Sequence, residues 1–132
     1  MNIIIAGSRD FKDYDFMENT LLCNQPTKSY VIQGLPRGEV LTIISGTATG
    51  ADRLGEIWAD KHNFEVERFP ADWERFGKKA GAIRNRQMAE HADLCIVFWD
   101  GQSRGTLNMI QTARDVGIPV HVYIYPKEND LC

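Results

Sequence analysis

The sequence has few cysteines, no long apolar run and no block of like charge. Its three cysteines, Cys23, Cys95 and Cys132, are far apart and form no CxxC pair, which argues against a disulfide framework or a structural zinc site. No stretch approaches the roughly 18 apolar residues of a membrane-spanning helix. The apolar run after Met1 is too short for a signal peptide. We therefore expect a soluble protein of the reducing cytoplasm, with no membrane partner.

The chain also lacks a dominant sign of charge and a metal-binding pattern. Fifteen Lys and Arg stand against eighteen Asp and Glu, and the formal net charge is −3. The electrostatic field of a protein with this net charge does not attract a nucleic-acid backbone or an anionic bilayer, so any anion-binding site must be formed by a local group of residues. The dispersed His62, His91 and His121 have no carboxylate or cysteine at metal-ligand spacing. We expect neither a metal ion nor a histidine base, and no required cofactor.

What the chain does contain is an alternation of strand-like and helix-like segments. Its 132 residues, 43% of them apolar, fit one domain. Five short runs rich in β-branched and aromatic residues are typical of strands buried on both faces. The expected strands are 3–6, 41–44, 66–69, 94–99 and 120–125, and the expected helices are 13–23, 51–62, 78–91 and 106–116. This order predicts an α/β fold: a single Rossmann-like doubly wound domain, with a mainly parallel sheet of about five strands flanked by helices.

Helical spacing predicts which side chains face the sheet, and one segment stays unassigned. Residues 24–39, rich in proline and glycine, are expected to form a surface excursion without an assigned role. The sheet-facing sets are Ala51, Leu54, Gly55 and Trp58; Thr106, Met109, Ile110, Ala113 and Gly117; and Gly81, Asn85, Met88 and Ala92. A buried amide such as Asn85 needs partners, which are either loop backbone groups or a ligand.

Small and polar residues gather where the predicted strands end. In an open parallel sheet, the loops that leave the carboxyl ends of the strands meet at one crevice, where ligands bind. The four loops expected there are 7–10, 45–52, 70–73 and 100–106. They contain the glycines, the hydroxyl side chains and Arg9, so we expect a ligand site at this edge.

The loop 45–52 carries small hydroxylated residues and two glycines just before a helix. Backbone N–H groups in such a loop can approach a phosphate, and the helix dipole favours its charge. The alternative is an ordinary turn in which Thr49 caps the helix and Asp52 returns a capping-box bond. A second glycine-flanked turn, with Gly101, Gly105 and Thr106, repeats the arrangement. Its alternative is a helix cap made by Ser103 or Thr106.

Two arginines and two tryptophans belong to the same crevice by their positions. Arg9 and Arg84 can reach it as planar donors to phosphate, although a solvated loop arginine is the alternative for Arg9. Trp73 and Trp99 lie beside it, where an aromatic ring can stack on a base. For Trp99, within a buried strand, a core role is the better interpretation.

Five ordered motifs resemble a known family over nearly the whole chain. They are Ile-Ala-Gly-Ser-Arg-Asp-Phe (5–11), Ser-Gly-Thr-Ala-Thr-Gly-Ala-Asp-Arg-Leu (45–54), Pro-Ala-Asp-Trp (70–73), Gly-Ala-Ile-Arg-Asn-Arg-Gln-Met-Ala (81–89) and Phe-Trp-Asp-Gly-Gln-Ser-Arg-Gly-Thr (98–106). The chain is similar to the YspA/YpsA-related branch of the SLOG superfamily. That superfamily joins DprA, a DNA-processing protein, with the LOG phosphoribohydrolases, and its members are thought to bind nucleotides, NAD or ADP-ribose derivatives.

The resemblance implies a Rossmann-like fold and a nucleotide-type ligand. The ligand residues that it implies are Gly7, Ser8, Arg9, Ser45, Gly46, Gly50, Ala51, Asp52, Arg84, Asn85, Gly101, Gly105 and Thr106. The crevice argument adds Thr47, Trp73 and Asp100 to the predicted ligand-binding residues. Relatives commonly associate, so a homodimer is the default expectation.

One departure from the LOG pattern bears on activity. LOG enzymes carry Pro-Gly-Gly-x-Gly-Thr-x-x-Glu, and here Met109 stands at the glutamate position. Three hypotheses follow, in this order: binding of a nucleotide or a NAD or ADP-ribose derivative, without a settled catalytic role; N-glycoside hydrolysis, with Asp52 or Asp100 as candidate catalytic carboxylate; and single-stranded DNA binding, which the net charge disfavours.

Overall fold

The computed structural model describes residues 1–23 and 41–125, in which strands and helices alternate. The predicted excursion 24–39 lies outside the described residues. The elements are β1 (Asn2–Gly7), α1 (Tyr14–Cys23), β2 (Thr42–Ser45), α3 (Ala51–Lys61), β3 (Glu65–Arg68), α4 (Trp73–Phe76), the 3-10 helix η1 (Gly77–Lys79), α5 (Ala80–His91), β4 (Leu94–Trp99), α6 (Arg104–Val116) and β5 (Val120–Ile124).

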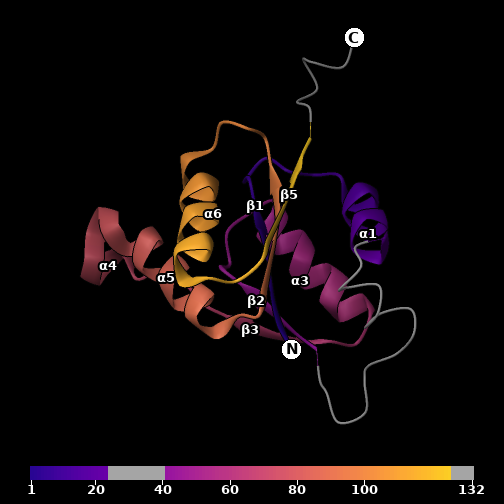
Figure 1. The fold of residues 1–132 in the computed structure, drawn as a ribbon, viewed down its shortest axis with the longest axis horizontal. Helices are drawn as coiled ribbons and strands as arrows, with labels where there is room; N and C mark the ends of the chain where they lie inside the picture. Colours follow the sequence, from indigo (N-terminus) through magenta and orange to yellow (C-terminus); the bar gives the residue numbers. More distant parts are fainter. Residues whose placement is uncertain (24–40, 126–132) are drawn as a thin grey trace.

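All five strands run parallel in one sheet with the order β3-β2-β1-β4-β5 (Figure 1). Along the chain, β2 and β3 are added on one side of β1, and β4 and β5 are then added on its other side. Loops after β1 and β4 therefore leave in opposite directions, which opens a crevice at the carboxyl ends of these neighbouring strands. The predicted Rossmann-like α/β fold is confirmed.

Helices cover both faces of the sheet (Figure 1). Side chains alternate along β1, so Ile3 and Ile5 pack with Trp58 on the side of α1 and α3, and Ile4 packs with Met88 on the side of α5 and α6. Each of these side chains is at most 1% exposed, which is why a strand buried on both faces is a nearly unbroken apolar run. Among the described helices, none has the length and apolar character needed to span a bilayer.

Three details differ from the sequence-based expectations. Strand β3 is mostly exposed, because it lies at the edge of the sheet and is not covered on both faces. Gly117 does not face the sheet; it ends α6 in the left-handed conformation, with φ of 98°. The helix expected from residue 78 begins at Ala80 and is preceded by η1 and by α4, a short helix that apolar spacing does not reveal.

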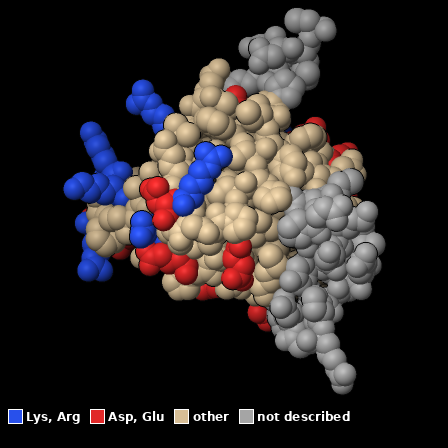
Figure 2. All heavy atoms as spheres, viewed as in Figure 1, with Lys and Arg blue, Asp and Glu red and all other residues tan. Residues whose placement is uncertain are grey.

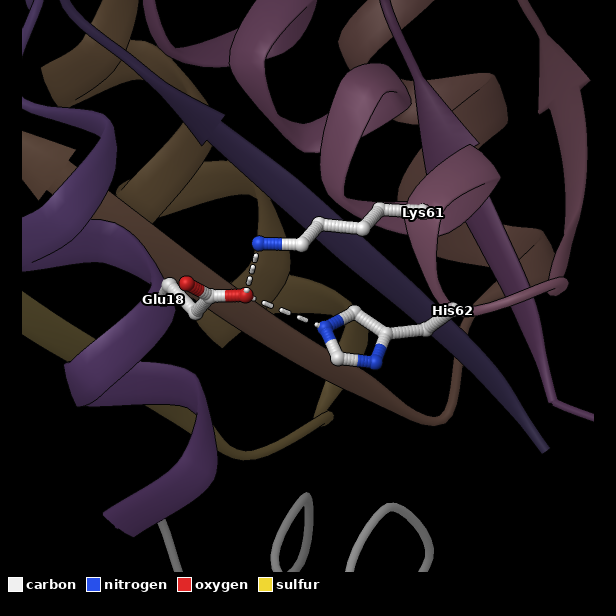
Figure 3. Close-up of polar contacts among 3 residues, drawn as sticks. All are labelled: Glu18, Lys61 and His62. Carbon is white, nitrogen blue, oxygen red and sulfur yellow. Dashed lines mark hydrogen bonds and ion pairs between the residues drawn. The ribbon is translucent and has the colours of Figure 1, made fainter.

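A polar cluster of Glu18, Lys61 and His62 joins α1 to the end of α3 (Figure 3). The Oε1 atom of Glu18 accepts a hydrogen bond from Lys61 Nζ at 3.0 Å and lies 3.3 Å from Nε2 of His62. The hydrogen bond from Lys61 lowers the pKa of Glu18, and that from His62 adds to the effect. The cluster thus stabilises the folded protein while Glu18 is ionised.

Replacing Glu18 by Gln tests this contribution. Since the pKa of Glu18 is lower in the folded state, its stabilising effect is present above about pH 4.5 and is lost as pH falls through the folded-state pKa. We expect urea unfolding to show a stability deficit of Glu18→Gln at pH 7 that shrinks as the pH falls below 4.5. A deficit that stays the same over the whole acid range would contradict the ionic explanation. Glu65→Gln, on the exposed strand β3, serves as the control.

Candidate functional site

Two adjoining hollows lie at the carboxyl ends of the strands. The larger hollow has a volume of about 360 Å³, and the smaller hollow about 280 Å³. Arg9, Ala48, Trp73 and Arg84 line both, so the two hollows share a wall. Their residues come from the loops after β1, β2 and β3, from α5 and from the beginning of α6. The crevice that the strand order predicts therefore exists.

The structure brings together most of the predicted site residues. Those that line the larger hollow are Gly7, Arg9, Asp52, Trp73, Arg84, Asn85, Gly105 and Thr106, and Gly46 and Thr47 line the smaller hollow. The other predicted residues do not line either hollow; they are Ser8, Ser45, Gly50, Ala51, Asp100 and Gly101. Their contacts explain why.

Several amides of the loop 45–52 are already used inside the protein. The N–H of Thr47 donates to Ser45 Oγ at 3.1 Å, that of Ala48 donates to Asp52 Oδ2 at 3.2 Å, and that of Ala51 donates to the Ser8 carbonyl at 3.2 Å. These amides therefore do not point at a ligand. The alternative with Thr49 as helix cap is also wrong: Gly50 is the N-cap of α3, without a side-chain cap.

Two of the motif glycines are required by close packing. A Cβ at Gly7 would lie 2.1 Å from the carbonyl oxygen of Phe98, and one at Gly50 would lie 2.3 Å from that of Ser8. Both glycines have positive φ, 155° and 77°, which L side chains rarely adopt. These residues let β1, β4 and α3 approach one another behind the hollows.

A buried network supports the rim of the smaller hollow. Ser45 Oγ donates to Glu56 Oε2 at 2.7 Å, and Arg68 Nε donates to Glu56 Oε1 at 2.9 Å. Ser45 also accepts the N–H of Thr47, which has a φ of 65°. A β-branched residue is strained in this conformation, by about 1–3 kcal/mol. The network holds the strained Thr47 in place.

The turn after β4 places the beginning of α6 beside the larger hollow. Asp100 Oδ1 accepts the N–H groups of Gln102 and Ser103, each at 2.8 Å, so its carboxylate organises the turn. Ser103 is the N-cap of α6 but makes no side-chain cap, contrary to the capping alternative. The first N–H groups of a helix have no acceptor within the helix. A Cβ at Gly105 would meet no atom within 4 Å, so there is open space beside this residue, which lines the larger hollow.

Arg84 joins the loop after β2 to α5. Its Nη1 donates to the Gly46 carbonyl, and its Nε donates to Asn85 Oδ1 at 3.0 Å. Asn85, 6% exposed, in turn donates from Nδ2 to Asn108 Oδ1 at 2.9 Å. Burial lowers the pKa of Arg84; the charge of Asp52 acts against this effect, and the nearby Arg9 adds a smaller lowering. The buried amide thus has protein partners, and it orients a partly buried guanidinium toward the hollows.

Asp52 supplies the only carboxylate among the residues that line the two hollows. Its side chain is buried, and burial raises its pKa to about 6, although the hydrogen bond from Ala48 and the charge of Arg84 favour the ionised form. On the opposite side, Met109 of α6 lines the larger hollow and is 2% exposed. Met109 stands at the position of the glutamate in the LOG motif, so the cavity has a thioether there and no carboxylate.

Sequence reasoning missed several residues of the larger hollow. Arg104, inside the predicted loop 100–106, and Asn108, four residues further along α6, line the hollow, as does the exposed Lys78 of η1. Figure 2 shows Lys and Arg gathered at the end of the molecule where α4 lies. Trp73, in α4, is 53% exposed and forms part of both hollows, whereas Trp99 packs against the core, as expected.

Comparisons with known proteins show which family the chain is similar to. The family model described as "YspA, cpYpsA-related SLOG family" matches residues 1–76. The chain is 36% identical to the Gene 61 protein of Mycobacterium phage D29 over 124 residues, which cover 89% of this chain and 92% of that protein. No solved structure matches the chain.

Proposed function

Because this chain belongs to the YspA, cpYpsA-related SLOG family, we propose that its larger hollow binds a nucleotide or a nucleotide-derived ligand through a phosphate group. The supporting observation is that cationic side chains outnumber carboxylates among the residues that line this hollow. Arg9, Lys78, Arg84 and Arg104 line it against the single carboxylate of Asp52. An anion in the hollow is attracted by these charges and by the uncapped beginning of α6.

The shape of the larger hollow is suited to the rest of a nucleotide. Ala6, Met88 and Met109 give it an apolar wall, and the exposed ring of Trp73 can stack on a base. Gly105 leaves room for a phosphate to approach the backbone amides of α6. NAD and ADP-ribose derivatives, which the family resemblance implies, contain such a nucleotide unit. The protein then senses or sequesters the ligand.

Calorimetric titration tests the proposal. We expect AMP, NAD or ADP-ribose to bind, and Arg9→Gln to weaken binding about tenfold, because a charge-assisted hydrogen bond contributes about 1.5–3 kcal/mol. Arg9 is exposed, so the substitution should leave the unfolding transition unchanged. Arg53→Gln, an exposed position of α3 outside both hollows, is the matched control. Absence of heat with all three compounds would refute the proposal.

A second candidate function is hydrolysis of the bond between base and ribose. It is favoured by the place of Asp52, a buried carboxylate that lines the hollow beside Arg84. In this reaction the C1′–N bond breaks and the base leaves. The ionised Asp52 stabilises the ribosyl cation, and water supplies the hydroxyl group at C1′; its proton goes to the leaving adenine of AMP, or to solvent when neutral nicotinamide leaves NAD. Asp100, the other predicted carboxylate, is bound to its own turn.

Release of free base from AMP or NAD tests this second candidate. We expect Asp52→Asn to reduce the rate about 100-fold or more while AMP still binds. Because the ionised carboxylate is the active form, the wild-type rate should rise with pH through about 6. Asp60→Asn, on the exposed side of α3, controls for the loss of a charge. A rate that Asp52→Asn leaves unchanged would exclude this role.

A further inference from the structure

A chain of hydrogen bonds runs from the loop after β2 through α5 to α6. Arg84 Nη1 donates to the Gly46 carbonyl, and Arg84 Nε donates to Asn85 Oδ1 at 3.0 Å. Asn85 Nδ2 then donates to Asn108 Oδ1 at 2.9 Å. Arg84, Asn85 and Asn108 all line the larger hollow. The chain therefore links a cation of the site to an amide on α6.

Arg84 sets the direction of every later bond in this chain. A guanidinium group has N–H donors and no acceptor, whereas an amide side chain has an oxygen that accepts and an NH₂ group that donates. Asn85 must therefore turn its oxygen to Arg84, which leaves its NH₂ group for Asn108. Asn108 must present its oxygen to Asn85, because a half-turn of its amide would bring two NH₂ groups together. Both amides thus have a single allowed orientation.

The NH₂ group of Asn108 is the donor that this chain leaves unused. It has no acceptor among the residues that the structure describes. Its nitrogen is also not one of the buried polar atoms that lack a partner there, so it is open to solvent at the hollow that Asn108 lines. A donor held in one orientation at the wall of a cavity favours a ligand that brings an acceptor to it.

The place of Asn108 along α6 relates it to the base of a nucleotide. Asn108 is four residues after Arg104, the first residue of α6, so it lies about 6 Å along the axis from the uncapped start of the helix. A Cβ at Gly81 would lie 3.5 Å from the ring of Trp73, and Gly81 is one turn of α5 before Asn85. With the phosphate at the start of α6 and the base stacked on Trp73, an edge of the base is therefore within reach of Asn108.

We propose that Asn108 is a specificity-determining residue that donates from Nδ2 to a ring nitrogen of a purine base, and that Asn85 is the positioning residue that keeps this donor turned to the ligand. This inference rests on the proposed function and deepens it by naming the ligand atom that the site recognises. A purine ring nitrogen without a hydrogen is an acceptor. A base with an N–H group at that place would oppose the NH₂ group of Asn108 and bind more weakly.

Deaza analogues of AMP test the recognition of a ring nitrogen. Calorimetry would compare AMP with 1-deaza-, 3-deaza- and 7-deaza-AMP, in each of which a CH group replaces one ring nitrogen. We expect one analogue to bind the wild type about three- to tenfold more weakly than AMP, because it loses one neutral hydrogen bond. Asn108→Asp keeps the acceptor for Asn85 and removes the donor, and Asn108→Ala removes both. The preference for AMP over that analogue should disappear in both variants.

Gln111→Glu is the matched control for the charge that Asn108→Asp adds. Gln111 is exposed, lies on the same helix and lines neither hollow, so its conversion from amide to carboxylate should keep the preference for AMP. Asn85→Asp tests the positioning role. A carboxylate there still accepts from Arg84 but has no donor for Asn108, so the Asn108 amide turns round and presents its oxygen to the hollow. We expect the preference to disappear in this variant also, although Asn108 is unchanged.

Each result bears on one claim. If AMP binds and all three analogues bind as tightly as AMP, recognition of a ring nitrogen is refuted and the proposed function stands. A preference that survives both Asn108 variants would mean that another residue recognises the base. A preference that survives Asn85→Asp but not the Asn108 variants would refute the positioning role alone. If no compound binds the wild type, both proposals fail.

Discussion

Gly7→Ala and Gly50→Ala should each lower the free energy of unfolding by about 3 kcal/mol or more. A positive φ costs an L side chain about 1–2 kcal/mol, and overpacking adds about 1–3 kcal/mol. Both costs apply here, because the new Cβ would lie 2.1 Å from the Phe98 oxygen in the first case and 2.3 Å from the Ser8 oxygen in the second. Urea unfolding at pH 7 measures the loss.

Gly101→Ala is the matched control for these substitutions. Its φ of 83° imposes a similar backbone strain, but a Cβ there meets no atom within 4 Å. We therefore expect a loss of only about 1–2 kcal/mol. Equal losses in all three variants would mean that backbone conformation alone requires these glycines, and that the close approach of β1, β4 and α3 does not.

Arg84→Met should have the largest effect on ligand binding. It removes a cation that lines both hollows and the donor to the Gly46 carbonyl, so both the ligand and the loop after β2 lose a partner. We expect AMP affinity to fall about 10- to 100-fold, since hydrogen bonds to charged groups contribute about 1.5–3 kcal/mol each. Calorimetry measures the affinity, and urea unfolding measures the accompanying loss of stability.

Arg86→Met provides the comparison on the same helix. Arg86 is exposed and pairs with Glu90 at 2.8 Å within α5, and surface pairs of this kind contribute about 0–1 kcal/mol. Both substitutions remove one positive charge from α5, so a general electrostatic effect would weaken binding equally. Unequal effects would assign the loss to the position of Arg84. Equal, small effects would contradict the site.

Most of the fold was predictable because its signals are local. The run Ile3–Ala6 indicated a strand covered on both faces, and the order of strands and helices indicated a parallel sheet. Helical phase placed Asn85 on the buried side of its helix, where it lies at 6% exposure. The edge position of β3 was not predictable, because apolar spacing does not report the order of strands in a sheet.

By itself, the sequence determined which loops meet. Parallel strands bring their carboxyl ends to one edge of the sheet, and this rule places Arg9, Gly46 and Gly105 together at that edge. Only the tertiary structure decided which donors are left for a ligand. Ser45 and Asp52 accept backbone amides that the glycine-rich loop was predicted to offer to a phosphate, and Arg84 donates to a carbonyl 38 residues away. The physical reason is that a hydrogen-bond partner depends on distance in space, whereas composition and periodicity report only neighbours along the chain.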